Sequence, residues 1–164
     1  MDIPGFDIRY TTMTDAPYLR EWLMAPGILH WFPMQEEKEV DDATACWIGF
    51  CRYSSSLTAT IDNVPVGIGT LFLMPYRKVA HHCLFKIIVD PKHHRKGVGH
   101  SLLKNLKHLA KNYFRLELIH IEVFEGNPLL HLLQKNDFRE FARQDRYVKE
   151  GDKYYGRVLL ESNL

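Results

Sequence analysis

Apolar and polar residues follow one another along the chain with two distinct periods. Alternation of apolar and polar positions is typical of half-buried strands, whereas apolar residues at helical spacing are typical of helices packed on a core. The first pattern predicts a strand at residues 6–12, and runs of strand-forming residues predict further strands at 56–61, 66–74, 83–89 and 116–123. The second predicts helices at residues 14–24, 36–53, 98–111 and 127–136. Residues 138–148 and 153–160 flank a turn signal at 149–152 and predict a hairpin.

The order of these elements predicts the fold class. A strand and two helices come first, and three strands follow as a meander. The last of these strands begins a strand, helix, strand, helix series that leads to the hairpin. This order is typical of an α+β fold built around one mixed sheet. No internal repeat or linker interrupts residues 1–164, so we expect a single domain with its own core.

The composition argues against several classes of protein. The chain is 46% hydrophobic and 25% charged, and its net charge of +1 argues against a general nucleic-acid binder. A local basic patch can still exist, and KHHRK at residues 92–96 is the alternative by which the chain would bind a nucleic acid. Cys46, Cys51 and Cys83 lack paired CxxC spacing, so neither a disulfide framework nor a metal site is expected. No long apolar span and no signal-peptide pattern occurs, so we expect no membrane partner and a cytoplasmic location.

The stretch VDPKHHRKGVGHSLL, residues 89–103, joins an apolar strand to a helix through a basic turn with two glycines. A helix start offers free backbone N–H groups and a partial positive charge, so a phosphate can bind there. A dinucleotide fingerprint would need glycine at Leu102, and a Walker loop would need lysine at His100, so neither motif matches. The alternative is that Gly97 and Gly99 only serve a tight turn and close packing.

Together with its surroundings, this turn resembles the acetyl-CoA-binding motif of the GNAT superfamily of acyl-CoA N-acyltransferases. The family pattern is Val-x-Pro, then Arg or Gln-x-x-Gly-x-Gly or Ala, and here His94 stands at the Arg or Gln position. The stretch IEVFEGNPLLHLLQKNDF is similar to a later motif of the family, with Asn127 and Phe138 matching and Asp137 replacing a glycine. The resemblance implies a mixed, mostly antiparallel sheet flanked by helices on both faces, with acetyl-CoA as co-substrate and no metal.

The resemblance also implies where acetyl-CoA binds. Backbone groups of residues 87–89 would hold the pantetheine arm, and the amides of residues 95–100 would hold the pyrophosphate. Asn127 would lie beside the pantetheine or its thioester, although it is also placed to cap a helix. The residues implied in binding are Ile87, Ile88, Val89, His94, Arg95, Lys96, Gly97, Val98, Gly99, His100, Ser101 and Asn127.

A general base is harder to identify from the motifs. In the family the base, or a water that it holds, is often reached from the strand that here covers residues 83–89. That strand carries no carboxylate, and the proton-transfer groups at its start are His81, His82 and Cys83. The alternatives are that these three residues are a strand end without a role, that water relays the proton, or that the amine binds already neutral.

A general acid is also missing from its usual place. The family's frequent acid is a tyrosine in the late helix, and that position aligns with Leu133. Either a tyrosine from elsewhere, such as Tyr147, Tyr154 or Tyr155, protonates the CoA thiolate, or the thiolate leaves unaided. Lys86 lies in an otherwise apolar strand, and we expect it to extend toward an edge of the sheet.

These features predict an N-acetyltransferase that transfers the acetyl group of acetyl-CoA to a primary amine. The acceptor could be a small molecule, a polyamine or a protein amino group, and the chain could act as a homodimer. The alternative is a catalytically degenerate protein that binds acyl-CoA as a sensor or structural subunit. The acidic run of residues 36–42 could attract a polyamine or a lysine, or it could simply be a solvated helix start.

Overall fold

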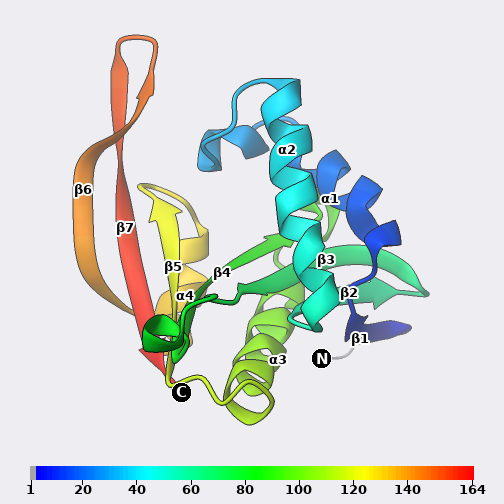
Figure 1. Ribbon diagram of the computed structural model, residues 1–164. Coiled ribbons are helices and arrows are strands. Elements are labelled where there is room, and N and C mark those ends of the chain that lie inside the picture. The colour runs from blue at the N-terminus through cyan, green and yellow to red at the C-terminus, as the bar shows by residue number, and fades with distance from the viewer. Residues whose placement is uncertain (1–2) are drawn as a thin grey trace.

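The computed structural model describes residues 3–164, which form one seven-stranded sheet with helices on both faces (Figure 1). The strand order is β1-β2-β3-β4-β5-β7-β6, and all neighbours are antiparallel except β4 and β5. The predicted α+β class with a mixed, mostly antiparallel sheet is confirmed. The strands are β1 (Phe6–Tyr10), β2 (Ser56–Ile61), β3 (Val64–Phe72), β4 (His82–Val89), β5 (Leu118–Phe124), β6 (Arg139–Glu150) and β7 (Lys153–Asn163).

The helices divide between the two faces of the sheet. Helices α1 (Ala16–Leu23) and α2 (Glu37–Ile48) cover one face, and a short 3-10 turn at Ile28–Trp31 joins them. Helices α3 (Val98–Asn112) and α4 (Leu129–Lys135) pack on the other face. The helix predicted for residues 36–53 ends early, because the chain tightens into a 3-10 turn at Gly49–Tyr53.

The main core lies between α3 and the sheet. Leu102, Leu103 and Leu106 form the centre of the apolar stripe on α3 and are fully buried, and each such leucine contributes about 2 kcal/mol to folding. Helix and sheet approach closely because β3 carries glycine at position 67. A β carbon there would lie 2.9 Å from Cδ1 of Leu102, so a larger residue would push α3 away.

A buried carboxylate ties the first strand to the first helix. Asp15 is only 2% exposed and accepts two hydrogen bonds from the Arg9 guanidinium, at 2.8 and 2.9 Å. It also accepts bonds from the Thr58 hydroxyl at 2.9 Å and the Thr12 amide at 3.0 Å. Because all of these groups favour the ionised form, Asp15 can remain charged although it is buried.

Strands β4 and β5 pair only at their first residues. The parallel ladder covers His82 with Leu118, Cys83 with Ile119, and Leu84 with His120, and then it stops. Beyond this point β4 continues to Val89 and β5 to Phe124, and Figure 1 shows the two strands diverging. The divergence leaves the β5-facing edge of β4 without a strand partner and opens the sheet at its centre. No helix within residues 3–164 is long and apolar enough to cross a membrane.

Candidate active site

A cleft of about 690 Å³ opens where β4 and β5 diverge. Its walls come from the end of β4, the turn before α3, the start of α4, and the loop that carries the 3-10 turn Ile28–Trp31. These segments are distant in sequence and meet because the ladder between β4 and β5 stops after Leu84 and His120. The cleft is therefore a product of the sheet topology.

Most of the residues predicted to bind acetyl-CoA line this cleft. Lys96, Val98 and Ser101 do not; Lys96 points to solvent and Val98 is buried in the core. The predicted residues that line the cleft are Ile87, Ile88, Val89, His94, Arg95, Gly97, Gly99, His100 and Asn127.

The start of α3 has the local structure of an anion site. Gly97 is the N-cap residue with φ of 87°, and no side chain caps the helix, so its first amides are left for a ligand. A β carbon at Gly99 would lie 3.2 Å from Leu132 Cδ2 and 3.7 Å from Val89 Cγ2. Glycine at this position thus brings α3 close to both α4 and β4. His94 Nε2 donates to the Val89 carbonyl at 2.9 Å, which holds the turn against the strand.

Asn127 caps a helix and also lies in the wall of the cleft. Its Oδ1 accepts a hydrogen bond from the Leu129 amide at 3.0 Å, which caps the start of α4. The same residue lines the cleft, and the hydrogen bond that caps α4 uses only its side-chain oxygen. Capping and ligand contact are therefore compatible at this position.

The candidate bases at the start of β4 are not brought to the cleft. His81 precedes the strand, and His82 and Cys83 belong to its paired part. The His82 ring lies 4.6 Å from that of His81 and 5.5 Å from that of His120. Cys83 is fully buried, and burial raises the pKa of its thiol to about 12. Cys83 therefore stays protonated near neutral pH, and a catalytic role for the two histidines stays a prediction.

The candidate acids also lie outside the cleft lining. Leu133 is fully buried in the core, so its position offers no polar group. Tyr147 on β6 is 39% exposed, and its ring lies 6.0 Å from that of Phe124. Tyr155 on β7 packs edge-on against His30 at 5.3 Å, and the Arg146 guanidinium lies 4.0 Å from the Tyr154 ring.

Charged side chains that the motifs did not identify lie on the α1 and α2 face of the diverging strands. The last paired residues are Leu84 and His120, so Lys86 and Glu122 are each two residues further along their strands and lie on one face. Arg157 of β7 pairs with Glu122 at 2.5 Å. In the sequence, Lys86, Glu122 and Arg157 are visible only as charged residues within strands that are otherwise apolar or alternating.

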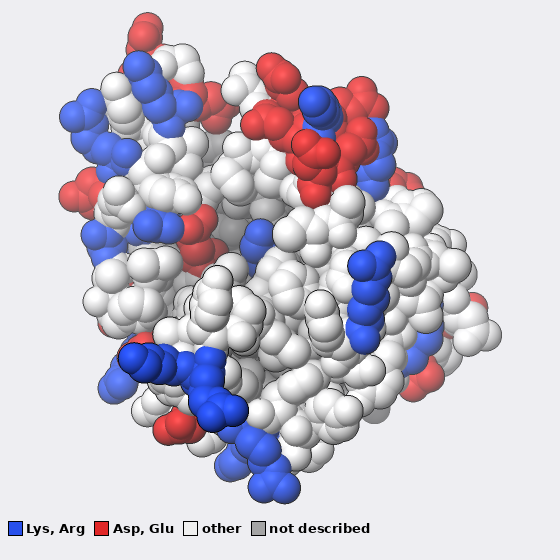
Figure 2. Space-filling model, in the orientation of Figure 1, with Lys and Arg blue, Asp and Glu red and all other residues white. Residues whose placement is uncertain are grey.

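Lys86 is placed differently from the sequence-based expectation. The β5-facing edge of β4 has no strand partner beyond Leu84, but the Lys86 side chain packs over aromatic rings of β3 and α2. Its Nζ lies 5.0 Å from the Phe72 ring centroid and 5.7 Å from that of Trp47. Figure 2 shows a hollow between the lobe of the β6–β7 hairpin and the lobe that carries α2, with charged atoms of both signs around it.

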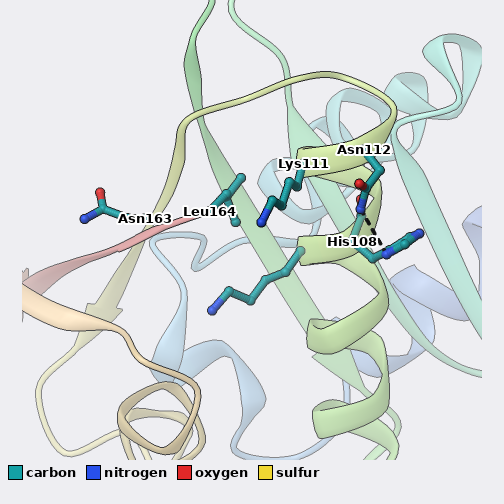
Figure 3. Close-up of a pocket in the computed structure, with 6 residues that line it drawn as sticks. His108, Lys111, Asn112, Asn163 and Leu164 are labelled. Carbon is teal, nitrogen blue, oxygen red and sulfur yellow. Dashed lines mark hydrogen bonds between the residues drawn. The ribbon is translucent and has the colours of Figure 1, made fainter.

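A second depression lies at the opposite end of α3 (Figure 3). It measures about 370 Å³, and the residues that line it include Lys107, Lys111, Asn163 and Leu164. Asn112 donates to His108 Nδ1 at 3.0 Å beside it. None of the motif residues lines this depression, so the cleft between β4 and β5 is the candidate site. Within residues 3–164, no three His, Cys, Asp or Glu side chains are grouped to hold a metal ion.

Comparison with known proteins identifies the family. The model of the GNAT acetyltransferase family matches residues 16–138. The L-amino acid N-acetyltransferase AaaT of Escherichia coli is 26% identical over 99 residues, which cover 60% of this chain and 61% of that protein. The match thus spans less than two thirds of that relative.

Solved structures agree on the fold. The yncA protein of Salmonella typhimurium, solved with its cofactor acetyl-CoA, superposes with a TM-score of 0.81 at 16% identity, over 98% of this chain and 94% of that one. The ribosomal-protein-alanine N-acetyltransferase of Brucella melitensis superposes with a TM-score of 0.80 at 16% identity, over 96% of this chain and 99% of that one. At such low identities these likenesses show the fold alone, whereas the family model covers most of the sequence. The chain belongs to the GNAT acetyltransferase family.

Proposed function

We propose that this protein is an N-acetyltransferase that transfers the acetyl group of acetyl-CoA to a primary amine. The observation that carries the proposal is the divergence of β4 from β5 after Leu84 and His120, beside the uncapped start of α3. A strand edge without a partner and a helix start with free amides suit an extended ligand that has amide groups at one end and phosphates at the other.

The proposed contacts follow from the chemistry of these segments. The free edge of residues 87–89 would pair with the amide groups of the pantetheine arm, as a neighbouring strand would. The amides at the start of α3 would take the pyrophosphate, with Arg95 adding charge. Asn127 would use its free side-chain N–H group beside the thioester.

Acetyl transfer forms a C–N bond and breaks a C–S bond, so the amine must lose a proton. For an amine with a pKa of about 10.4, reaching the neutral form at pH 7.4 costs roughly 4 kcal/mol. We propose Glu122 as the group that attracts the ammonium and accepts its proton, directly or through water. Its support is its position two residues past the last pair of the ladder, on the face opposite α3.

The departing thiolate needs no dedicated acid in this proposal. A thiol has a pKa of about 8.5, so the thiolate is a tolerable leaving group near neutral pH. This fits the apolar, fully buried Leu133 at the position where the family often has a tyrosine. If a tyrosine from elsewhere, such as Tyr147, acts as the acid, its replacement by phenylalanine should lower the rate of acetyl transfer.

A thiol-release assay with a panel of amines tests the function. We expect release of CoA thiol that depends on both acetyl-CoA and an amine, with the acetylated amine seen by mass spectrometry. Acetyl-CoA should also raise the thermal midpoint of the protein through linkage. A shift in the midpoint without thiol release, even in a single turnover, would instead indicate a degenerate acyl-CoA-binding protein. Neither shift nor release would rule out both functions.

A further inference from the structure

Lys86 is a cation without an anionic partner at the centre of the sheet. Its Nζ lies over Phe72 and Trp47, and the Trp47 indole N–H donates to Thr70 Oγ1 at 2.8 Å, which fixes that ring. Thr70 is the residue that pairs with Lys86 across β3 and β4. Among residues 3–164 no carboxylate lies within ion-pair distance of Lys86.

The neighbouring arginine is already engaged. Arg157 donates to Glu122 Oε2 at 2.5 Å and to Gln144 Oε1 at 3.1 Å, and its guanidinium lies 3.9 Å from the Tyr147 ring centroid. Lys86, by contrast, has no ion-pair partner among residues 3–164. Within residues 3–164 the second oxygen of Glu122, Oε1, accepts no hydrogen bond, so it can still receive an ammonium group.

A partly buried ammonium group without a counter-ion is unfavourable, because aromatic faces replace only a part of its hydration. The cost is offset if the bound substrate brings an anion to this position. Glu122 lies on the same face of the diverging strands as Lys86 and close enough for its charge to act on the pKa of Lys86, so a positive and a negative site lie near one another. A ligand that fits both sites carries an ammonium and a carboxylate a few atoms apart.

We propose that the acceptor is an amino acid or a similar small amine with a carboxylate, whose ammonium binds at Glu122 and whose carboxylate binds Lys86. This inference rests on the proposed acetyl transfer and assigns Lys86 a role in acceptor selectivity. A polyamine fits less well, because its further positive charges would meet Lys86.

The acidic start of α2 does not favour a polycation either. Figure 2 shows an acidic patch on the lobe that carries α2. Arg20 of α1 binds both Glu37 and Asp41 of this helix, each at 2.5 Å, and Glu39 accepts hydrogen bonds from the amides of Gln35 and Glu36. Much of the acidic run is thus engaged in holding the helix start.

Paired acceptors test the inference. Each L-amino acid of a panel is compared with its own amide, which keeps the amine and the side chain but lacks the carboxylate. With saturating acetyl-CoA, the parent protein should show a higher kcat/KM for the best acid than for its amide. Lys86→Met should raise KM for the acid by about tenfold or more, which is the effect expected when a charge-assisted hydrogen bond is lost. KM for the amide should change little. Because each ratio is compared between variants, the different amine pKa values of acid and amide cancel.

Two further variants make the result specific. Lys86→Arg keeps the charge and should retain most of the preference for the acid. Lys104→Met makes the same substitution at an exposed position of α3, away from the diverging strands. It should change KM for neither the acid nor the amide. A folded Lys86→Met protein with an unchanged ratio of acid to amide would overturn the inference. This result leaves the proposed acetyl transfer standing, provided that some amine releases CoA thiol.

Discussion

Lys86 and Glu122 lie on the same face of β4 and β5, each two residues beyond the point where the ladder between these strands ends. Burial lowers the pKa of Lys86, and the nearby Cys46 and Glu122 offset only a part of this effect. The lowered pKa means that folding disfavours the charged form of this lysine. The charged Lys86 side chain therefore lowers the stability of the fold, which is not expected of a residue with a purely structural role.

Replacement of Lys86 by methionine should therefore stabilise the protein. The folded-state pKa lies below the unfolded value of 10.5, so the cost is fully present below the folded pKa and vanishes as the pH rises past 10.5. We expect Lys86→Met to increase the free energy of unfolding by about 1 kcal/mol at pH 7, which raises Tm by about 2–4 °C. The increase should be smaller at alkaline pH. Thermal unfolding across this pH range measures the effect. A lower Tm at neutral pH would mean that the contacts with Trp47 and Phe72 outweigh desolvation.

The identity of the base can be read from variants and from the pH profile. Glu122→Gln should lower kcat/KM by about 10²-fold and leave acetyl-CoA affinity unchanged. Glu140→Gln is the matched control, because Glu140 is exposed and pairs only within β6, with Arg143 at 3.0 Å. If Glu122 is the base, the inflection of the pH profile should persist in His81→Ala and His82→Ala and be lost in Glu122→Gln.

The same measurement tests the histidines at the start of β4. An inflection between about pH 6 and 7 that is lost in His81→Ala or His82→Ala would identify that histidine as the base. Glu122 would then act only in binding the ammonium. An inflection that moves with the pKa of the amine, in variants as active as the parent, would exclude both histidines.

Gly99→Glu should abolish acetyl-CoA binding. The new side chain would start 3.2 Å from Leu132 and bring negative charge to the amides that are proposed to hold the pyrophosphate. Gly49→Glu is the control, because a β carbon at Gly49 meets no atom within 4 Å. Calorimetry with acetyl-CoA compares the two variants, and circular dichroism confirms that each is folded. Parent-like affinity in a folded Gly99→Glu protein would place the phosphates elsewhere.

Asp15→Asn should destabilise the fold without affecting the site. Burial raises the pKa of Asp15, but the bonds from Arg9, Thr12 and Thr58 outweigh it and hold the pKa below its usual value. A lowered folded-state pKa gives stability that is present above the unfolded value near 3.8 and is lost as the pH falls through the folded one. We expect a loss of about 1–3 kcal/mol at pH 7 and a smaller difference in acid. Urea unfolding at several pH values measures it, and a constant difference would contradict the assignment.

The local patterns predicted most elements because secondary structure follows short-range periodicity. The strand-forming runs at residues 56–61 and 83–89 match β2 and β4, and the apolar stripe from Val98 to Ala110 matches α3. The element ends were less predictable. The helix predicted for 36–53 ends at Ile48, and β7 runs on to Asn163, because pairing with β5 extends it.

The sequence by itself determined the family, the fold class and the glycine turn, because these depend on contiguous residues whose spacing is visible in one dimension. The tertiary structure decided which charges meet. That Lys86 and Glu122 share one face at the diverging strands depends on a parallel register that stops after Leu84 and His120. No local pattern encodes where a ladder stops, since helices and loops packed on both faces set that point. The histidines adjacent in sequence to β4 thus lie at its paired end, whereas Glu122 comes from a strand more than thirty residues later, between Leu118 and Phe124.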